Sequence, residues 1–219
     1  MRKALVYVEG YTEERFVRDL LAPHLLRRGL ILTPTLAKTK RTKSGPDFKG
    51  GITSYPRVRR EIERLLGDTS VVLVTTMIDF YSLPASFPGV GDVAGGTCYE
   101  RVEFLEQQLS QDIGDPRFRA YLQLHEFEAL LFSNLEELDG AFPDAEVLAE
   151  LRRIRGQFGS PEEIDDGQTT APSKRLLSLL PEYQKALHGP RITSRIGLER
   201  LRSECPHFAR WLEMLEGAF

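Results

Sequence analysis

Hydrophobic residues occur along the chain in short runs that predict buried strands. Three such runs, at residues 4–8, 30–36 and 71–78, are aliphatic and rich in β-branched side chains. The run VVLVTTMI at residues 71–78 is apolar almost throughout, which is typical of a parallel strand covered on both faces. Residues 118–124 predict one further strand.

Segments with helical spacing alternate with these strands. Thr12 is a good helix N-cap, and Glu13 and Glu14 follow it in a first turn, where carboxylates suit the helix dipole. Pro23 predicts a kink in this helix, and Gly29 predicts its end. Further helices are predicted at residues 55–66 and 99–109, and one begins over Glu126 to Phe132.

This alternation predicts an α/β fold with a mainly parallel central sheet flanked by helices. After Phe142 the pattern becomes helical and polar, and residues 192–215 predict a helical segment at the end of the chain. We therefore expect an α/β domain at residues 1–140 and a helical C-terminal extension packed on it at residues 141–219.

Composition gives no global signature of nucleic-acid binding. The chain has 219 residues, of which 41% are hydrophobic and 28% charged, and its formal net charge is −3. Any contact with nucleic acid must therefore come from a local basic patch. One loop supplies such a patch and holds the candidate nucleic-acid-binding residues, although an ordinary solvated surface is the alternative. These residues are Lys38, Lys40, Arg41, Lys43 and Lys49.

Other features predict a cytoplasmic protein that does not enter a membrane. The N-terminal apolar run is too short for a signal peptide, and no apolar segment reaches the roughly 20 residues that span a bilayer. Cys98 and Cys205 lack metal-ligand spacing and are expected to be reduced thiols. The Gly-rich residues 89–96 do not form a P-loop, so ATP hydrolysis would require a partner.

Acidic residues follow two of the predicted strands. Glu9 ends the first strand and Asp79 ends the central one, while Glu13 lies one helical turn after Glu9. Carboxyl ends of parallel strands share one edge of a sheet, where ligands bind. Carboxylate oxygens suit Mg²⁺ or Mn²⁺, which would support phosphoryl transfer. Helix capping by the two glutamates and a turn at Asp79 are the alternative explanation.

A second acidic group follows the strand predicted at residues 118–124. Glu126 is explained equally well as an additional metal ligand and as the start of a helix. For Glu128 and His125 a structural role is favoured. On an α-helix, residues two apart point in different directions, so we expect only one of the two glutamates to reach the site.

The motifs at these positions resemble a TOPRIM domain, the fold of topoisomerases, primases and OLD-family nucleases. Val8-Glu9-Gly10-Tyr11-Thr12-Glu13 resembles the first motif, in the form that OLD-like nucleases carry, and Ile78-Asp79-Phe80-Tyr81 resembles the second. Tyr81 stands where that pattern has a second Asp. The resemblance implies catalytic and metal-binding roles for Glu9, Glu13 and Asp79, and Glu126 would supply the ligand and catalytic carboxylate that Tyr81 leaves missing. It also implies a cationic catalytic role for Lys185, although a solvated helix lysine is the more common case.

Over nearly its full length the chain also resembles a family of bacterial TOPRIM-like proteins often encoded beside ABC- or SMC-like ATPases. VEGYTE, MIDFYSLPASFPG, QLHEFEALLF, SKRLLSLLPEYQKA and the C-terminal IGLERLRSECPHFARWLEML carry this resemblance. It implies a Mg²⁺-dependent nuclease subunit that acts on DNA with a separate ATPase, in anti-phage defence or DNA processing. A non-catalytic adaptor, phosphoryl transfer on nucleotides or tRNA, and a homodimer all stay open.

Overall fold

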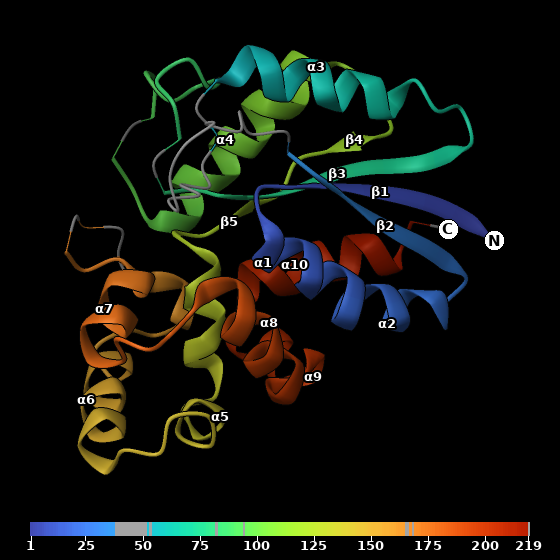
Figure 1. Cartoon of the computed structure of the whole chain (residues 1–219). Coiled ribbons are helices and arrows are strands. Elements are labelled where there is room, and N and C mark those ends of the chain that lie inside the picture. Colours follow the sequence, from blue (N-terminus) through green and yellow to red (C-terminus); the bar gives the residue numbers. More distant parts are fainter. Residues whose placement is uncertain are drawn as a thin grey trace, which may run out of the picture.

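A computed structural model describes residues 1–37, 54–81, 83–93, 95–164 and 169–218, together with residues 52 and 167. Its centre is a twisted sheet in the order β2-β1-β3-β4, with β5 also paired to β3, and every strand pair is parallel (Figure 1). The strands are β1 (Arg2–Val8), β2 (Leu30–Leu36), β3 (Val71–Asp79), β4 (Phe118–Arg119) and β5 (Leu122–Gln123). The expected parallel α/β fold is confirmed.

The continuous strand predicted at residues 118–124 is wrong in detail, because two short strands replace it. Between β4 and β5 the backbone of Tyr121 leaves the ladder and is held by a side chain of β3. The Thr76 hydroxyl donates to the Tyr121 carbonyl at 2.7 Å and accepts from the Tyr121 N–H at 2.9 Å. A buried threonine thus replaces the missing backbone partners, which the apolar pattern could not indicate.

One face of the sheet is covered by α3 (Tyr55–Leu66) and α4 (Cys98–Ile113), as Figure 1 shows. The bounds of α3 match the predicted helix at residues 55–66. Its buried residues recur every three or four positions, so one apolar stripe packs on the sheet. These residues are Tyr55, Val58, Ile62 and Leu66. Helix α4 begins at the Thr97 N-cap and ends at Gly114, whose φ of 70° suits glycine.

The other face is covered first by α1 (Tyr11–Phe16), the π-helical turn η1 (Val17–Leu21) and α2 (Ala22–Leu26). Leu21 and Ala22 keep helical backbone angles, and the Ala22 N–H donates to the Val17 carbonyl five residues earlier, so a wide π turn directly precedes Pro23. The predicted single helix is therefore a helix with one π turn ahead of its proline. Gly29, with a φ of 86°, ends the segment as expected.

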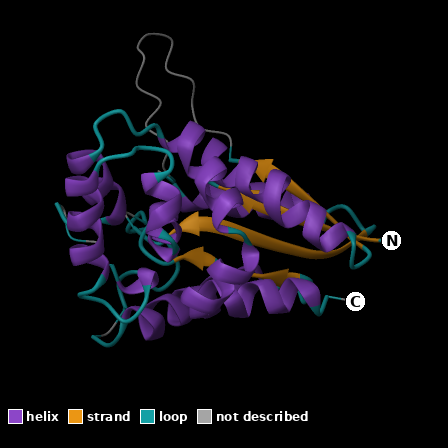
Figure 2. Cartoon of the chain, turned by 90° about the horizontal axis from the view of Figure 1, so that it is seen from below, coloured by secondary structure: helices purple, strands orange, loops and turns teal. Residues whose placement is uncertain are grey.

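Helices from the C-terminal half complete this second face. Figure 2 shows that most of the chain around the sheet is helical. The remaining elements are η2 (Phe127–Ser133), α5 (Leu135–Asp139), α6 (Ala145–Arg155), η3 (Pro161–Glu163), α7 (Pro172–Leu179), α8 (Lys185–Ile196), α9 (Leu198–Glu204) and α10 (Pro206–Glu216).

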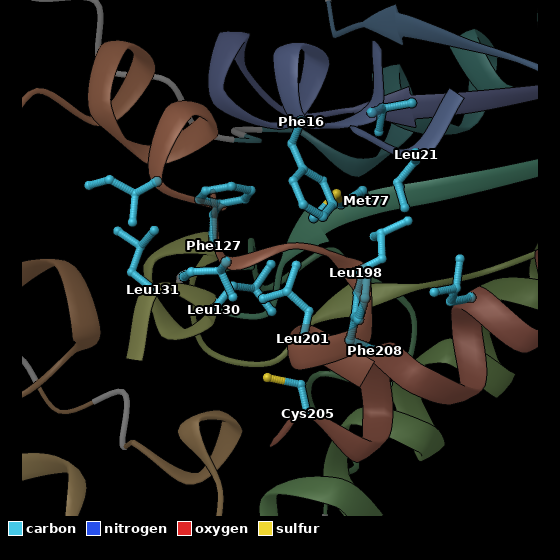
Figure 3. Packing of buried hydrophobic residues seen from close by; sticks show 14 of the residues in the cluster. Phe16, Leu21, Met77, Phe127, Leu130, Leu131, Leu198, Leu201, Cys205 and Phe208 are labelled. Atoms are coloured by element: carbon cyan, nitrogen blue, oxygen red, sulfur yellow. The ribbon is translucent and has the colours of Figure 1, made fainter. Parts of the chain in front are cut away.

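A buried apolar cluster joins both halves of the chain. In Figure 3, Phe16 of α1 and Met77 of β3 lie in the same cluster as Phe127 of η2 and Phe208 of α10. Phe16 makes edge contacts with both of these phenylalanines, at centroid distances of 5.4 and 5.9 Å. The division at residues 140 and 141 stays a prediction, since this core includes residues from either side of it. No described helix is long and apolar enough to cross a membrane.

Candidate acidic site at the carboxyl edge of the sheet

Glu9 and Asp79 lie side by side where β1 and β3 end. The strands are neighbours in parallel register, with Val8 opposite Met77. The Asp79 backbone N–H donates to Glu9 Oε2 at 3.1 Å, and the Glu9 N–H donates to the Met77 carbonyl at 3.3 Å. Both carboxylates are partly buried. The expected proximity of these two strand-end acids is therefore present.

Glu13 turns back toward this edge from the first turn of α1. Its Oε2 accepts the Gly10 backbone N–H at 2.8 Å, and the Glu14 N–H donates to the Gly10 carbonyl at 3.0 Å. Glu13 is only 6% exposed. Glycine suits this N-cap position, since a Cβ on Gly10 would come within 3.1 Å of the Glu13 carboxylate.

Asp79 connects the end of β3 to the segment that carries Glu126. Its Oδ1 accepts the Phe127 N–H at 3.0 Å, and Tyr81 donates its backbone N–H to the His125 carbonyl at 2.8 Å. His125 has a φ of 58°, in the left-handed region that non-glycine residues seldom occupy. After this turn the backbone at Phe127 lies against the Asp79 carboxylate, and the strand does not continue.

Lys185, the first residue of α8, supplies a positive charge to the same group of side chains. Its Nζ lies 3.1 Å from Glu128 Oε2 and 3.5 Å from Glu126 Oε1. The Tyr183 hydroxyl donates to Glu128 Oε1 at 3.4 Å, and both side chains are buried. The Lys185 side chain as a whole is 42% exposed, whereas the side chains of Glu126 and Glu128 are 7% and 2% exposed.

Both Glu126 and Glu128 contact Lys185, so the expectation that they point in different directions is wrong. That expectation assumed an α-helix beginning at Glu126. Glu126 instead has an extended backbone, with φ −145° and ψ 158°, and the segment from Phe127 is a 3₁₀ helix. In this local geometry the two carboxylates converge on one ammonium.

Burial and mutual repulsion make these carboxyl groups weak acids. Burial is the main cause that raises the pKa of Glu9 to about 7, and burial together with the negative Glu9 raises the pKa of Glu13 to about 8. Burial, Glu9 and Glu13 raise the pKa of Asp79 well above its usual range. Burial alone would lower the pKa of the Lys185 ammonium, but the nearby Glu128, Glu126 and Asp79 outweigh it and raise that pKa.

The donor chemistry of this site fits a hard divalent cation. Each of Glu9, Glu13 and Asp79 uses an oxygen to accept one backbone N–H, and a carboxylate has about four acceptor positions. Among the described residues, no three His, Cys, Asp or Glu side chains are already arranged to hold a metal ion together. Mg²⁺ typically takes one or two protein carboxylates and keeps several waters.

Some predicted site residues fall outside this arrangement. Lys38, Lys40, Arg41, Lys43 and Lys49, the predicted nucleic-acid-binding loop, lie outside the described residues. The structure also brings in Ser173 and Tyr183, which the sequence analysis missed. Ser173 lies 47 positions from the glutamate that it contacts, so no local pattern could have indicated it.

The chain is thus an α/β protein with a parallel sheet whose carboxyl edge gathers an acidic site and one lysine. It belongs to the family described as "Domain of unknown function (DUF4276)", whose model matches residues 8–216. A comparison with curated protein sequences finds no match. Among solved structures, the chain is similar to the C-terminal region of the Xanthomonas campestris pv. campestris OLD protein. Identity is 15%, coverage is 96% of each chain, and the TM-score of 0.36 is too low to transfer residue roles.

Proposed function

We propose that this protein is a Mg²⁺- or Mn²⁺-dependent nuclease subunit that hydrolyses phosphodiester bonds. One observation carries the proposal: Glu9, Glu13 and Asp79 meet at the carboxyl edge of the parallel sheet, next to the segment whose Glu126 contacts Lys185. Buried carboxylates that repel one another are costly for the fold, and they persist where a bound cation or a reaction uses them.

Each residue has a role that follows from its position. Glu9 and Asp79 would hold the metal ion, which, when bound, neutralises phosphate charge and polarises the phosphorus centre. Glu13, whose buried carboxylate lies beside Glu9, would assist as a further metal ligand or as the general base. The ammonium of Lys185, on a partly exposed side chain, would pair with phosphate oxygens of the substrate.

The substrate and partners are proposed from the TOPRIM resemblance of the VEGYTE and Ile78-Asp79 segments. We propose DNA as substrate and a separate ABC- or SMC-like ATPase as partner, in a cytoplasmic anti-phage or DNA-processing system. Substrate approach would use the basic loop with Lys38, Lys40, Arg41, Lys43 and Lys49, because lysine and arginine neutralise backbone phosphates.

The test is a cleavage assay on labelled DNA and RNA with Mg²⁺, Mn²⁺ or a chelator, with and without the ATPase encoded nearby. Glu9→Ala and Asp79→Asn should each lower cleavage by at least about 100-fold, since losing even an outer-shell partner of a metal typically costs 10–100-fold. Glu14→Gln, an exchange of a nearby α1 glutamate outside the site, is the control and should cleave normally. Full cleavage by Glu9→Ala, or none by the wild type under any of these conditions, would contradict the proposal.

A second candidate function is a non-catalytic adaptor that binds the ATPase. Tyr81 favours it, because it occupies the place of the second Asp in the TOPRIM pattern, and its backbone N–H is bonded to the His125 carbonyl. Calorimetry separates the two functions. An adaptor would bind no divalent cation and would still form a stable complex with the ATPase.

A further inference from the structure

The start of α7 holds the carboxylate of Glu126. The Ser173 backbone N–H donates to Glu126 Oε2 at 2.9 Å, and the Ser173 hydroxyl donates to Glu126 Oε1 at 2.9 Å. Glu126 is 5% exposed and Ser173 is 2% exposed. Both oxygens of a buried carboxylate are therefore held by two donors of a single residue.

This contact fixes the direction of Glu126 relative to the other acids. Before Glu126, the chain passes through the left-handed backbone of His125, a conformation that costs of order 1–2 kcal/mol for a non-glycine residue. After it, the Phe127 N–H is held by Asp79. Ser173 provides the third constraint, so the Glu126 carboxylate cannot turn without losing both hydrogen bonds to it.

We infer that Ser173 is a positioning residue, which aims the Glu126 carboxylate at the metal ion that the proposed function requires. It acts through Glu126 and touches neither substrate nor metal. A carboxylate with two bonds to Ser173 and one to Lys185 keeps acceptor capacity for a cation, because about four lone-pair positions are available. The C-terminal helices thus contribute to the site through a seryl hydroxyl as well as through Lys185.

The inference rests on the proposed metal-dependent function and is tested by metal affinity rather than by cleavage. Mn²⁺ binding to the purified full chain is measured by calorimetry for the wild type, Ser173→Ala, Glu126→Gln and the double variant. Ser173→Ala should weaken Mn²⁺ binding by about 10-fold or more, as outer-shell substitutions typically do. Ser178→Ala is the control, since its hydroxyl on the same helix donates only to the Arg175 carbonyl and is exposed.

The double variant separates positioning from a general loss of structure. If Ser173 acts through Glu126, adding Ser173→Ala to Glu126→Gln should cause less than about a twofold further loss of Mn²⁺ affinity. The inference would be overturned if the fold-losses of Mn²⁺ affinity of the two single variants multiplied in the double variant, or if Ser173→Ala bound Mn²⁺ as tightly as the wild type. Either result would leave the proposed function in place. A wild-type chain that binds no Mn²⁺ would overturn both. Should Ser173→Ala not fold, Ser173→Cys, with a weaker donor of similar size, tests the same direction.

Discussion

Replacing Glu13 with glutamine should stabilise the metal-free protein at alkaline pH. Glu13 is buried beside Glu9, and its pKa is raised to about 8 from an ordinary value of 4.5, first by burial and then by the charge of Glu9. Glutamine has nearly the same shape and retains an oxygen for the Gly10 N–H, which Glu13 accepts at 2.8 Å. The substitution therefore removes a titratable charge while keeping the cap.

The sign follows from which state binds the proton. Between pH 4.5 and about 8 the Glu13 carboxyl is ionised in the unfolded chain but protonated in the folded protein. The folded state then binds more protons, so stability falls as pH rises through this window and levels off above it. At roughly 1.4 kcal/mol per pH unit, the ceiling on this loss is about 5 kcal/mol. Glu9 and Asp79 remain buried acids in the variant, so we expect Glu13→Gln to recover only part of this lost stability, about 2–3 kcal/mol.

The measurement is urea unfolding at pH 4.5, 6.5 and 8.5 with a chelator present. The wild type and Glu13→Gln should have similar stabilities at pH 4.5, and the variant should become the more stable one as pH rises. Glu14→Gln, on the same helix and paired at 3.9 Å with Arg18, should instead follow the wild-type profile. Parallel wild-type and Glu13→Gln profiles across this range would refute the reasoning.

Three further predictions concern stability, each measured by urea unfolding. Glu162→Ala should lower the free energy of unfolding by about 3 kcal/mol, because the fully buried carboxylate accepts two backbone N–H groups at the start of α10. An unchanged urea midpoint would contradict this. Gly189→Val should lower the free energy of unfolding by about 2 kcal/mol through overpacking, since a Cβ added at this position would lie 3.1 Å from Phe127 and from the Tyr183 hydroxyl. An unchanged stability would mean that α8 can shift to make room. Thr97→Ala should cost about 1 kcal/mol by removing the α4 N-cap, whereas Thr97→Ser should be nearly neutral.

Local patterns were sufficient for most of the fold. The apolar runs that become β1, β2 and β3 are visible in the sequence because a strand covered on both faces needs such residues at nearly every position. Helix α3 was predicted with its bounds, since its buried residues repeat at helical spacing. The strand-end positions of Glu9 and Asp79 followed from the same patterns, because parallel strands place their carboxyl ends at one edge.

Tertiary structure decided which other side chains complete the acidic site. Lys185 and Ser173 meet the glutamates only after α7 and α8 pack against η2, and no spacing in the sequence encodes contacts over such separations. The convergence of Glu126 and Glu128 depends on the extended backbone of Glu126 and the 3₁₀ helix that follows it, which the sequence pattern did not indicate. Sequence alone thus determined the elements, whose apolar periodicity is local, whereas the arrangement of charges at the site depends on long-range packing.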